Sequence, residues 1–160
     1  MRYREIQQKL VPITAVRLVS FVMLYRQSVA YDESDDKHLY CHPGWYSCSM
    51  NLAEQACHLA FAAADGSAAR EISFAAGEKD MAALRLLLDD IGVTSLNGWQ
   101  AENDGSGYEL ELQGEYAEGE HLRLYARGNY LVSPPADIDE ITFFFNVLAE
   151  KAGCRFTRKI

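Results

Sequence analysis

Hydrophobic and polar residues alternate along five segments of the chain, a pattern typical of strands with one buried face. These segments are residues 45–52, 57–63, 72–76, 108–112 and 122–126. Residues 13–25 differ, because they are rich in β-branched and aromatic side chains and are apolar on both alternating faces. That pattern predicts a central strand that is covered on both sides. Together the segments predict a mainly antiparallel sheet of five or six strands.

Two further segments have hydrophobic residues at helical spacing. One stripe consists of Met81, Leu84, Leu87, Leu88 and Ile91, and the other of Ile138, Ile141, Phe144, Phe145 and Leu148. Asp137 is placed to cap the second helix, and Gly92 and Gly153 are placed to end the two helices. The sequence therefore predicts a single α+β domain over residues 1–160, with two principal helices packed on one face of the sheet.

The chain also divides into two similar halves, each with a hairpin followed by a helix. Gly44-Trp45 begins the first half and Gly98-Trp99 begins the second, and the two helical stripes align without a gap. Either an ancient duplication or common packing rules would produce this similarity. We favour the packing rules slightly, because few residue identities are shared.

The charge of the chain restricts its partners. Fifteen basic and 23 acidic residues give a net charge of −8, in a chain that is 49% hydrophobic. An acidic surface repels phosphate backbones, so nucleic-acid binding is disfavoured. The same charge keeps a protein soluble, and it also attracts a basic protein partner.

The N-terminal region contains an apolar run at residues 18–25, between Arg17 and Arg26. This run is far shorter than the ~20 residues that span a bilayer. The two arginines also disfavour an export signal. The sequence therefore predicts a cytoplasmic protein that does not bind membranes.

Four acidic residues cluster in the polar segment 31–38, namely Asp32, Glu33, Asp35 and Asp36. Their spacing lacks the central glycine and the terminal glutamate of a calcium-binding loop. The cluster is therefore either a solvated loop or a docking patch for a basic partner. We predict a docking patch as the functional hypothesis.

The cysteines and histidines give no recognisable catalytic or metal site. The four cysteines, Cys41, Cys48, Cys57 and Cys154, include no close pair of the kind that supplies zinc ligands. Cys48 and Cys57 lie in apolar rows, which predicts two buried thiols. Cys41 and His42 are adjacent, and neighbours on an extended chain point apart. We expect no catalytic residue, metal or cofactor.

Three apolar residues lie off the helical stripes, namely Leu86 on the first helix and Phe143 and Val147 on the second. The two helices could pack against each other through these side chains, or a partner could cover them, including a second copy of the chain in a homodimer. We favour packing between the helices, because two helices on one sheet are usually neighbours.

The segments "NGW", "DGSGYELEL" and "SPPADIDEI" resemble a group of small bacterial α+β proteins that combine a tryptophan turn, a hairpin and a proline-preceded helix. The resemblance covers the last two-thirds of the chain and departs from the pattern at "EYAEGEH". It implies no catalytic residue. At the level of class, the acidic α+β character is also similar to that of immunity proteins that neutralise bacterial toxins.

Size, charge and the lack of a catalytic motif favour a non-enzymatic binding protein of the inhibitor or immunity type, which docks a basic protein partner. A structural or oligomeric accessory protein fits the same observations. An enzyme of unrecognised type is the third alternative.

Overall fold

The computed structural model describes residues 4–5, 10–28, 30, 42–102, 107–128 and 137–154. In this part of the chain, eight strands form one sheet with the order β1-β6-β8-β7-β2-β3-β4-β5. The strands are β1 (Arg4–Glu5), β2 (Leu18–Gln27), β3 (Gly44–Asn51), β4 (Ala56–Ala63), β5 (Ala69–Ala75), β6 (Gln100–Glu102), β7 (Tyr108–Tyr116) and β8 (His121–Gly128). The helices are α1 (Glu78–Asp90), the short 3-10 helix η1 (Thr94–Leu96) and α2 (Ile138–Lys151).

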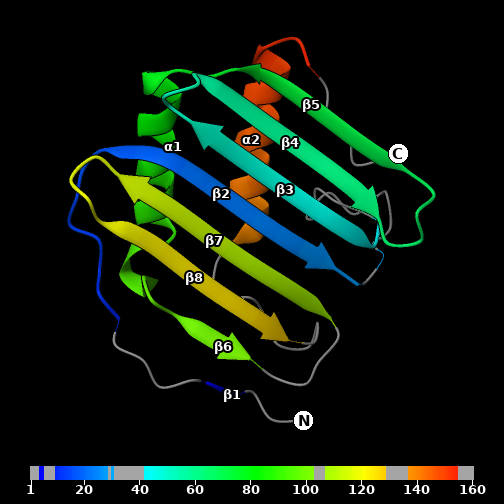
Figure 1. Cartoon of the computed structure of the whole chain (residues 1–160), viewed down its shortest axis with the longest axis horizontal. Helices are drawn as coiled ribbons and strands as arrows, with labels where there is room; N and C mark the ends of the chain where they lie inside the picture. Colours follow the sequence, from blue (N-terminus) through cyan, green and yellow to red (C-terminus); the bar gives the residue numbers. More distant parts are fainter. Residues whose placement is uncertain are drawn as a thin grey trace.

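Strand β2 is the centre of the sheet (Figure 1). It pairs antiparallel with β3 on one side and with β7 on the other. The meander β3-β4-β5 continues from the first pairing, and β8, β6 and β1 continue from the second. The six long strands are antiparallel to their neighbours, and only the short β6 runs parallel, alongside β8. The predicted α+β fold with a mainly antiparallel sheet is confirmed.

The strands of the two similar halves lie on opposite sides of β2 (Figure 1). Gly44-Trp45 begins β3, which pairs directly with β2. Gly98-Trp99 instead precedes β6, which lies outside β8. The hairpins and helices of the halves correspond along the chain, but their first strands occupy different positions in the sheet.

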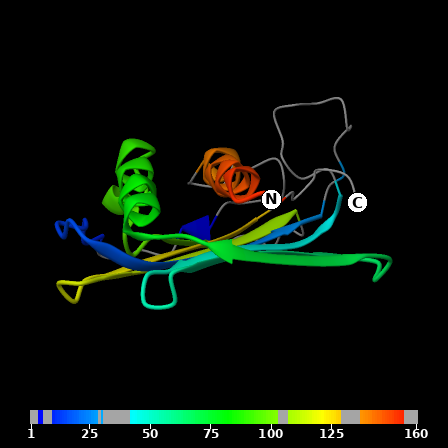
Figure 2. The ribbon, with the colours of Figure 1, turned by 90° about the horizontal axis from the view of Figure 1, so that it is seen from above.

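Both helices lie on the same face of the sheet (Figure 2). The carboxylate of Asp80 accepts a hydrogen bond from Gly77 N (3.0 Å) at the start of α1, and that of Asp137 accepts one from Glu140 N (3.2 Å) in α2. Gly92 follows α1 with φ of 81°, a conformation that favours glycine, which explains why the helix ends there. No helix among the described residues has the length and hydrophobicity needed to cross a bilayer.

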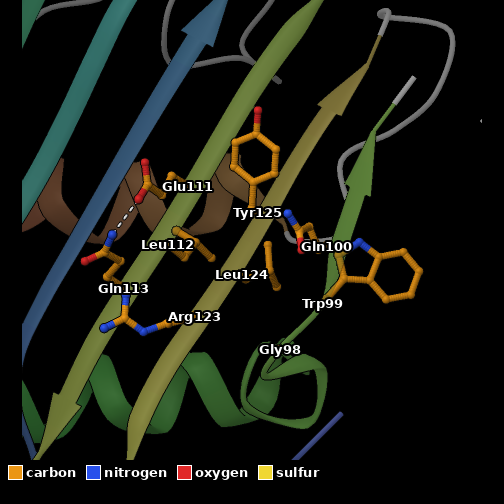
Figure 3. Close-up of a pocket in the computed structure, with 9 residues that line it drawn as sticks. All are labelled: Gly98, Trp99, Gln100, Glu111, Leu112, Gln113, Arg123, Leu124 and Tyr125. Carbon is orange, nitrogen blue, oxygen red and sulfur yellow. Dashed lines mark hydrogen bonds between the residues drawn. The ribbon is translucent and has the colours of Figure 1, made fainter. Parts of the chain in front are cut away.

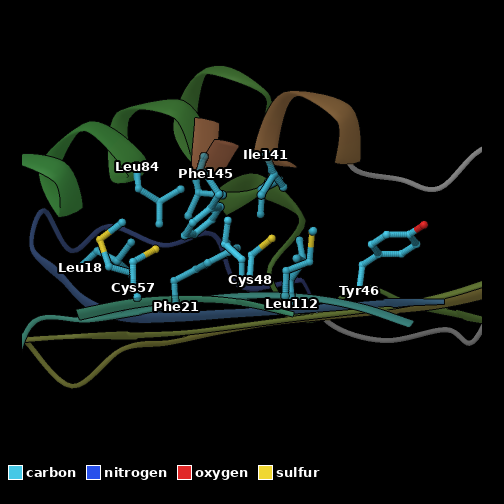
Figure 4. Close-up of a cluster of buried hydrophobic side chains, with 14 of the residues drawn as sticks. Leu18, Phe21, Tyr46, Cys48, Cys57, Leu84, Leu112, Ile141 and Phe145 are labelled. Carbon is cyan, nitrogen blue, oxygen red and sulfur yellow. The ribbon is translucent and has the colours of Figure 1, made fainter. Parts of the chain in front are cut away.

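The hydrophobic core lies between the helices and the sheet (Figure 4). Phe21 of β2 and Phe145 of α2 are both at most 1% exposed, and their rings stack with centroids 6.0 Å apart. Leu84 of α1 and Ile141 of α2 are fully buried beside them. Burial of each such side chain contributes about 1.5–3 kcal/mol to the stability of the folded state, because its apolar surface is removed from water. This contact between β2 and the two helices holds the layers together.

The opposite face of β2 is not covered by any described element (Figure 2). Val22 is 36% exposed and Leu24 is 42% exposed on that face. Our expectation of a central strand covered on both sides is therefore wrong for its second face. Side chains of similar hydrophobicity alternate along β2, so the sequence pattern does not distinguish a covered face from an open one.

The two adjacent aromatic residues of α2 provide a test of this layering. Phe145 is fully buried, whereas Phe143 is 55% exposed. We expect Phe145→Ala to lower the free energy of unfolding by ~3–5 kcal/mol, because it leaves a cavity against Phe21. Phe143→Ala should change it by less than ~1 kcal/mol. Urea denaturation of both variants measures the difference, and equal losses would contradict the assigned helix orientation.

Candidate functional site

The face of the sheet that no described element covers, here called the open face, carries four rows of side chains in register across the six long strands. From β8 to β5 the rows are Arg127-Glu109-Arg26-Trp45-Ala62-Ala69, Tyr125-Glu111-Leu24-Ser47-Ala60-Glu71, Arg123-Gln113-Val22-Ser49-His58-Ser73 and His121-Glu115-Ser20-Asn51-Ala56-Ala75. These side chains alternate with the buried ones, because successive residues of a strand point to opposite faces. The four rows contain three arginines and four glutamates, and Glu115 contacts His121, so the open face is nearly balanced in charge.

The centre of the open face is apolar. Trp45 of β3 is 49% exposed, and Leu24 and Val22 are exposed on the neighbouring strand β2. The Arg26 guanidinium lies 5.9 Å from the centroid of the Trp45 ring, and Arg26 Nε lies 3.9 Å from Glu109 Oε2. An exposed tryptophan surrounded by polar groups is typical of a protein interface. The open face is therefore the first candidate docking surface.

The two flanks of the open face differ in side-chain size. Strands β7 and β8 present long side chains: Glu109, Glu111, Gln113, Glu115, His121, Arg123, Tyr125 and Arg127. Strands β4 and β5 present mainly alanine and serine, together with His58 and Glu71. The face thus has a raised half and a low half, separated by β2 and β3.

A hollow of about 310 Å³ lies on the raised half (Figure 3). Its polar lining comes from β7, β8 and Gln100, and Trp99 lies on its β6 side. Gln113 Nε2 donates a hydrogen bond to Glu111 Oε1 (2.5 Å), and Arg123 extends over β7 toward this pair. Burial, followed by the charges of Glu109 and Glu102, raises the pKa of Tyr125. Its phenol therefore remains a neutral hydrogen-bond donor.

A histidine contact occurs on the low half. His58 Nδ1 lies 2.6 Å from Ser73 Oγ, and His58 Nε2 lies 3.7 Å from Glu54 Oε2. Serine hydrolases use the opposite nitrogens, with Nε2 toward the serine and Nδ1 toward the acid. The His58 and Glu54 side chains are also 43% and 63% exposed. This geometry does not activate Ser73 in the way a catalytic triad does. We therefore interpret the contact as a hydrogen bond between surface side chains.

The predicted burial of two thiols is confirmed. Cys48 and Cys57 are both 0% exposed and lie under the helices (Figure 4). Burial, followed by the nearby Cys48 and Asp80, raises the pKa of Cys57 to about 12. A protonated, inaccessible thiol is neither a nucleophile nor a metal ligand. Within the described residues, no three histidine, cysteine or acidic side chains come together as a metal site, and Cys41 lies outside those residues.

The second candidate docking surface is the outer surface of the two helices, here called the helix layer. Phe143 of α2 is 55% exposed and Leu86 of α1 is 53% exposed, so our expectation that they pack between the helices is wrong. Val147, one turn beyond Phe143, is partly buried. Leu86 lies on the side of α1 opposite its buried residues Met81, Leu84 and Leu88. The exposed pair therefore faces solvent.

The helix layer is acidic, in contrast to the open face. Helix α1 carries four acidic and two basic residues, and α2 carries three acidic residues and one basic residue. Glu140, Glu150 and Asp90 are all exposed. An exposed aromatic residue beside carboxylates suits a partner that offers both apolar and basic groups.

The predicted acidic docking patch lies outside the described residues. Asp32, Glu33, Asp35 and Asp36 belong to the segment that joins β2 to β3. The open face was not predicted, although the alternation of Trp45, Ser47 and Ser49 with buried residues indicated a polar side of β3. The sequence did not show that none of the described helices covers that side of β3.

The chain matches no family model, and no curated protein or solved structure matches it.

Thiol accessibility provides a chemical test of the core. Cys48 and Cys57 should react slowly with a disulfide reagent such as DTNB at pH 8 in native buffer, and quickly in denaturant. Cys154, which is only partly buried, should react before them and is the internal reference. Mass spectrometry of peptides after timed labelling separates the sites. Native-state labelling of Cys57 as fast as that of Cys154 would contradict the burial.

Proposed function

We propose that this protein is a non-enzymatic binding protein of the inhibitor or immunity type, which docks a basic protein partner on its helix layer. The observation that carries the proposal is the exposure of Phe143 on an acidic helix, where 55% of the residue is accessible. A large aromatic residue left in water costs free energy that burial against a partner would recover.

The arrangement around Phe143 supports a basic partner. Interface energy concentrates in a few aromatic anchors, and charged groups at the rim steer association. Phe143 and Leu86 supply apolar anchors, and Glu140, Glu150 and Asp90 supply exposed negative charge near the helix ends. The net charge of −8 extends the attraction beyond direct contact.

The acidic segment with Asp32, Glu33, Asp35 and Asp36 belongs to the same proposal as a second source of negative charge. Carboxylates clustered in one segment repel each other, and a cationic partner relieves this repulsion on docking. The alternative of an oligomeric accessory protein is supported by a different observation, the open face with its exposed Trp45.

Partner capture tests the proposal. The immobilised protein should retain a basic protein from the lysate of its source organism, identified by mass spectrometry and then purified. Surface plasmon resonance should show fast association that slows as salt rises, because the Debye length falls from ~10 Å at 0.1 M to ~3 Å at 1 M. Capture of an acidic protein, or an association rate that does not change with salt concentration, would contradict the proposal of a basic partner.

Matched variants locate the contact. Phe143→Ala should weaken binding of the captured partner by ~2 kcal/mol, about 30-fold, mainly through faster dissociation. The triple change Glu140→Gln, Glu150→Gln and Asp90→Asn should mainly slow association. Replacing Asp32, Glu33, Asp35 and Asp36 with Asn, Gln, Asn and Asn should also slow it. Trp45→Ala, on the opposite side of the molecule, is the control and should bind like the wild type.

A further inference from the structure

We infer that the open face binds a second copy of this chain, with a two-fold axis that runs parallel to the strands between β2 and β3. The result is a homodimer with four layers, in which the two sheets pack face to face and both helix layers remain outside. This inference does not depend on the proposed function, because the helix layer stays accessible in the dimer.

The size of the open face is sufficient for a stable contact. Six strands at about 4.8 Å spacing and seven residues at about 3.3 Å each give a face of roughly 29 Å by 23 Å. Two such faces in contact bury roughly 1,300 Å², within the ~1,200–2,000 Å² of specific interfaces. Packed sheets keep their strand directions within about 30° of each other, which an axis parallel to the strands satisfies.

The two-fold axis places the raised half of one copy on the low half of the other. Strand β2 then lies over β3 of the second copy, β7 over β4 and β8 over β5, and each row faces the same row. In the second row, Glu111 faces Ala60 of the second copy and Leu24 faces Ser47. In the other three rows, Glu109 faces Ala62, Arg123 faces Ser73 and Glu115 faces Ala56. Long side chains therefore meet short ones across the contact.

The charges also match under this symmetry. A contact between identical surfaces brings like charges together unless the pattern is self-complementary. Here Glu71 is the one carboxylate that the four rows place on the low half, and it faces Tyr125 in β8. Arg123 and Arg127 flank Tyr125 on the same strand, so Glu71 meets two cations and a phenol at the edge of the hollow.

The centre of the face completes the contact. Arg26 faces Trp45 of the second copy, so each indole lies between two guanidinium groups, its own at 5.9 Å and that of the other copy. Val22 and Leu24 are covered in the same step. The helix layer lacks this self-complementarity, because its excess of acidic residues would repel a copy of itself.

Sedimentation velocity over a range of protein concentrations tests the dimer. The wild type should sediment as a dimer that dissociates on dilution. Ala60→Glu should give a monomer, because it places a carboxylate against Glu111 of the second copy. The double variant Ala60→Glu with Glu111→Ala exchanges the two side chains and should restore the dimer. Rescue by this exchange is the result expected when positions 60 and 111 face each other across the two-fold axis.

Two controls make the result specific. Ala82→Glu adds the same charge to the exposed side of α1, and Phe143→Ala removes the anchor of the helix layer; both should remain dimers. Circular dichroism of each variant checks that the fold is kept. A wild type that stays monomeric at all concentrations would overturn the inference. So would a dimer that Ala60→Glu leaves intact, or a folded Ala60→Glu monomer that Glu111→Ala does not rescue.

Discussion

Packing of the two helices on one face of the sheet is the constraint that shapes both candidate surfaces. Phe21 of the central strand stacks on Phe145 of α2, and Leu84 of α1 closes the core from the other helix. Because strand residues alternate in direction, each side chain buried under the helices places its neighbour on the opposite face. The same geometry turns Phe143 and Leu86 away from the core. One set of buried contacts thus determines which residues are left for partners.

The two outer surfaces differ in a way that suggests different uses. The helix layer combines exposed apolar residues with an excess of acidic groups, which suits a partner of opposite charge. The open face has three arginines and four glutamates in its four rows, with Glu115 in contact with His121, and its raised and low halves are complementary in size. A charge-balanced surface is the place where an acidic protein can meet its own copy without strong repulsion. The two proposals therefore use opposite sides of the molecule and are compatible.

Among the described residues, those with potential chemistry do not form a site together. Cys48 and Cys57 are inside the core, where burial keeps the Cys57 thiol protonated. His58 contacts Ser73 on the exposed side of the sheet, with its two nitrogens in the reverse of the orientation used by serine hydrolases. The two buried thiols and the His58–Ser73 contact thus lie on opposite faces of the sheet and cannot act together.

Much of the fold followed from local patterns in the sequence. The alternation around Cys48 and Cys57 and the helical stripes through Leu84 and Phe145 identified strands, helices and buried residues, because a local period determines which side chains share a face. The sequence could not say whether a second layer covers the other face of β2. Val22 and Leu24 are apolar in either case, and their exposure depends on where distant helices pack. The same limit applied to Phe143. The sequence showed that this residue lies off the hydrophobic stripe of its helix, but it did not show whether another helix packs against it. Local periodicity thus determined the faces of each element, and only the tertiary arrangement decided which faces remained open, because coverage depends on contacts between residues far apart in the chain.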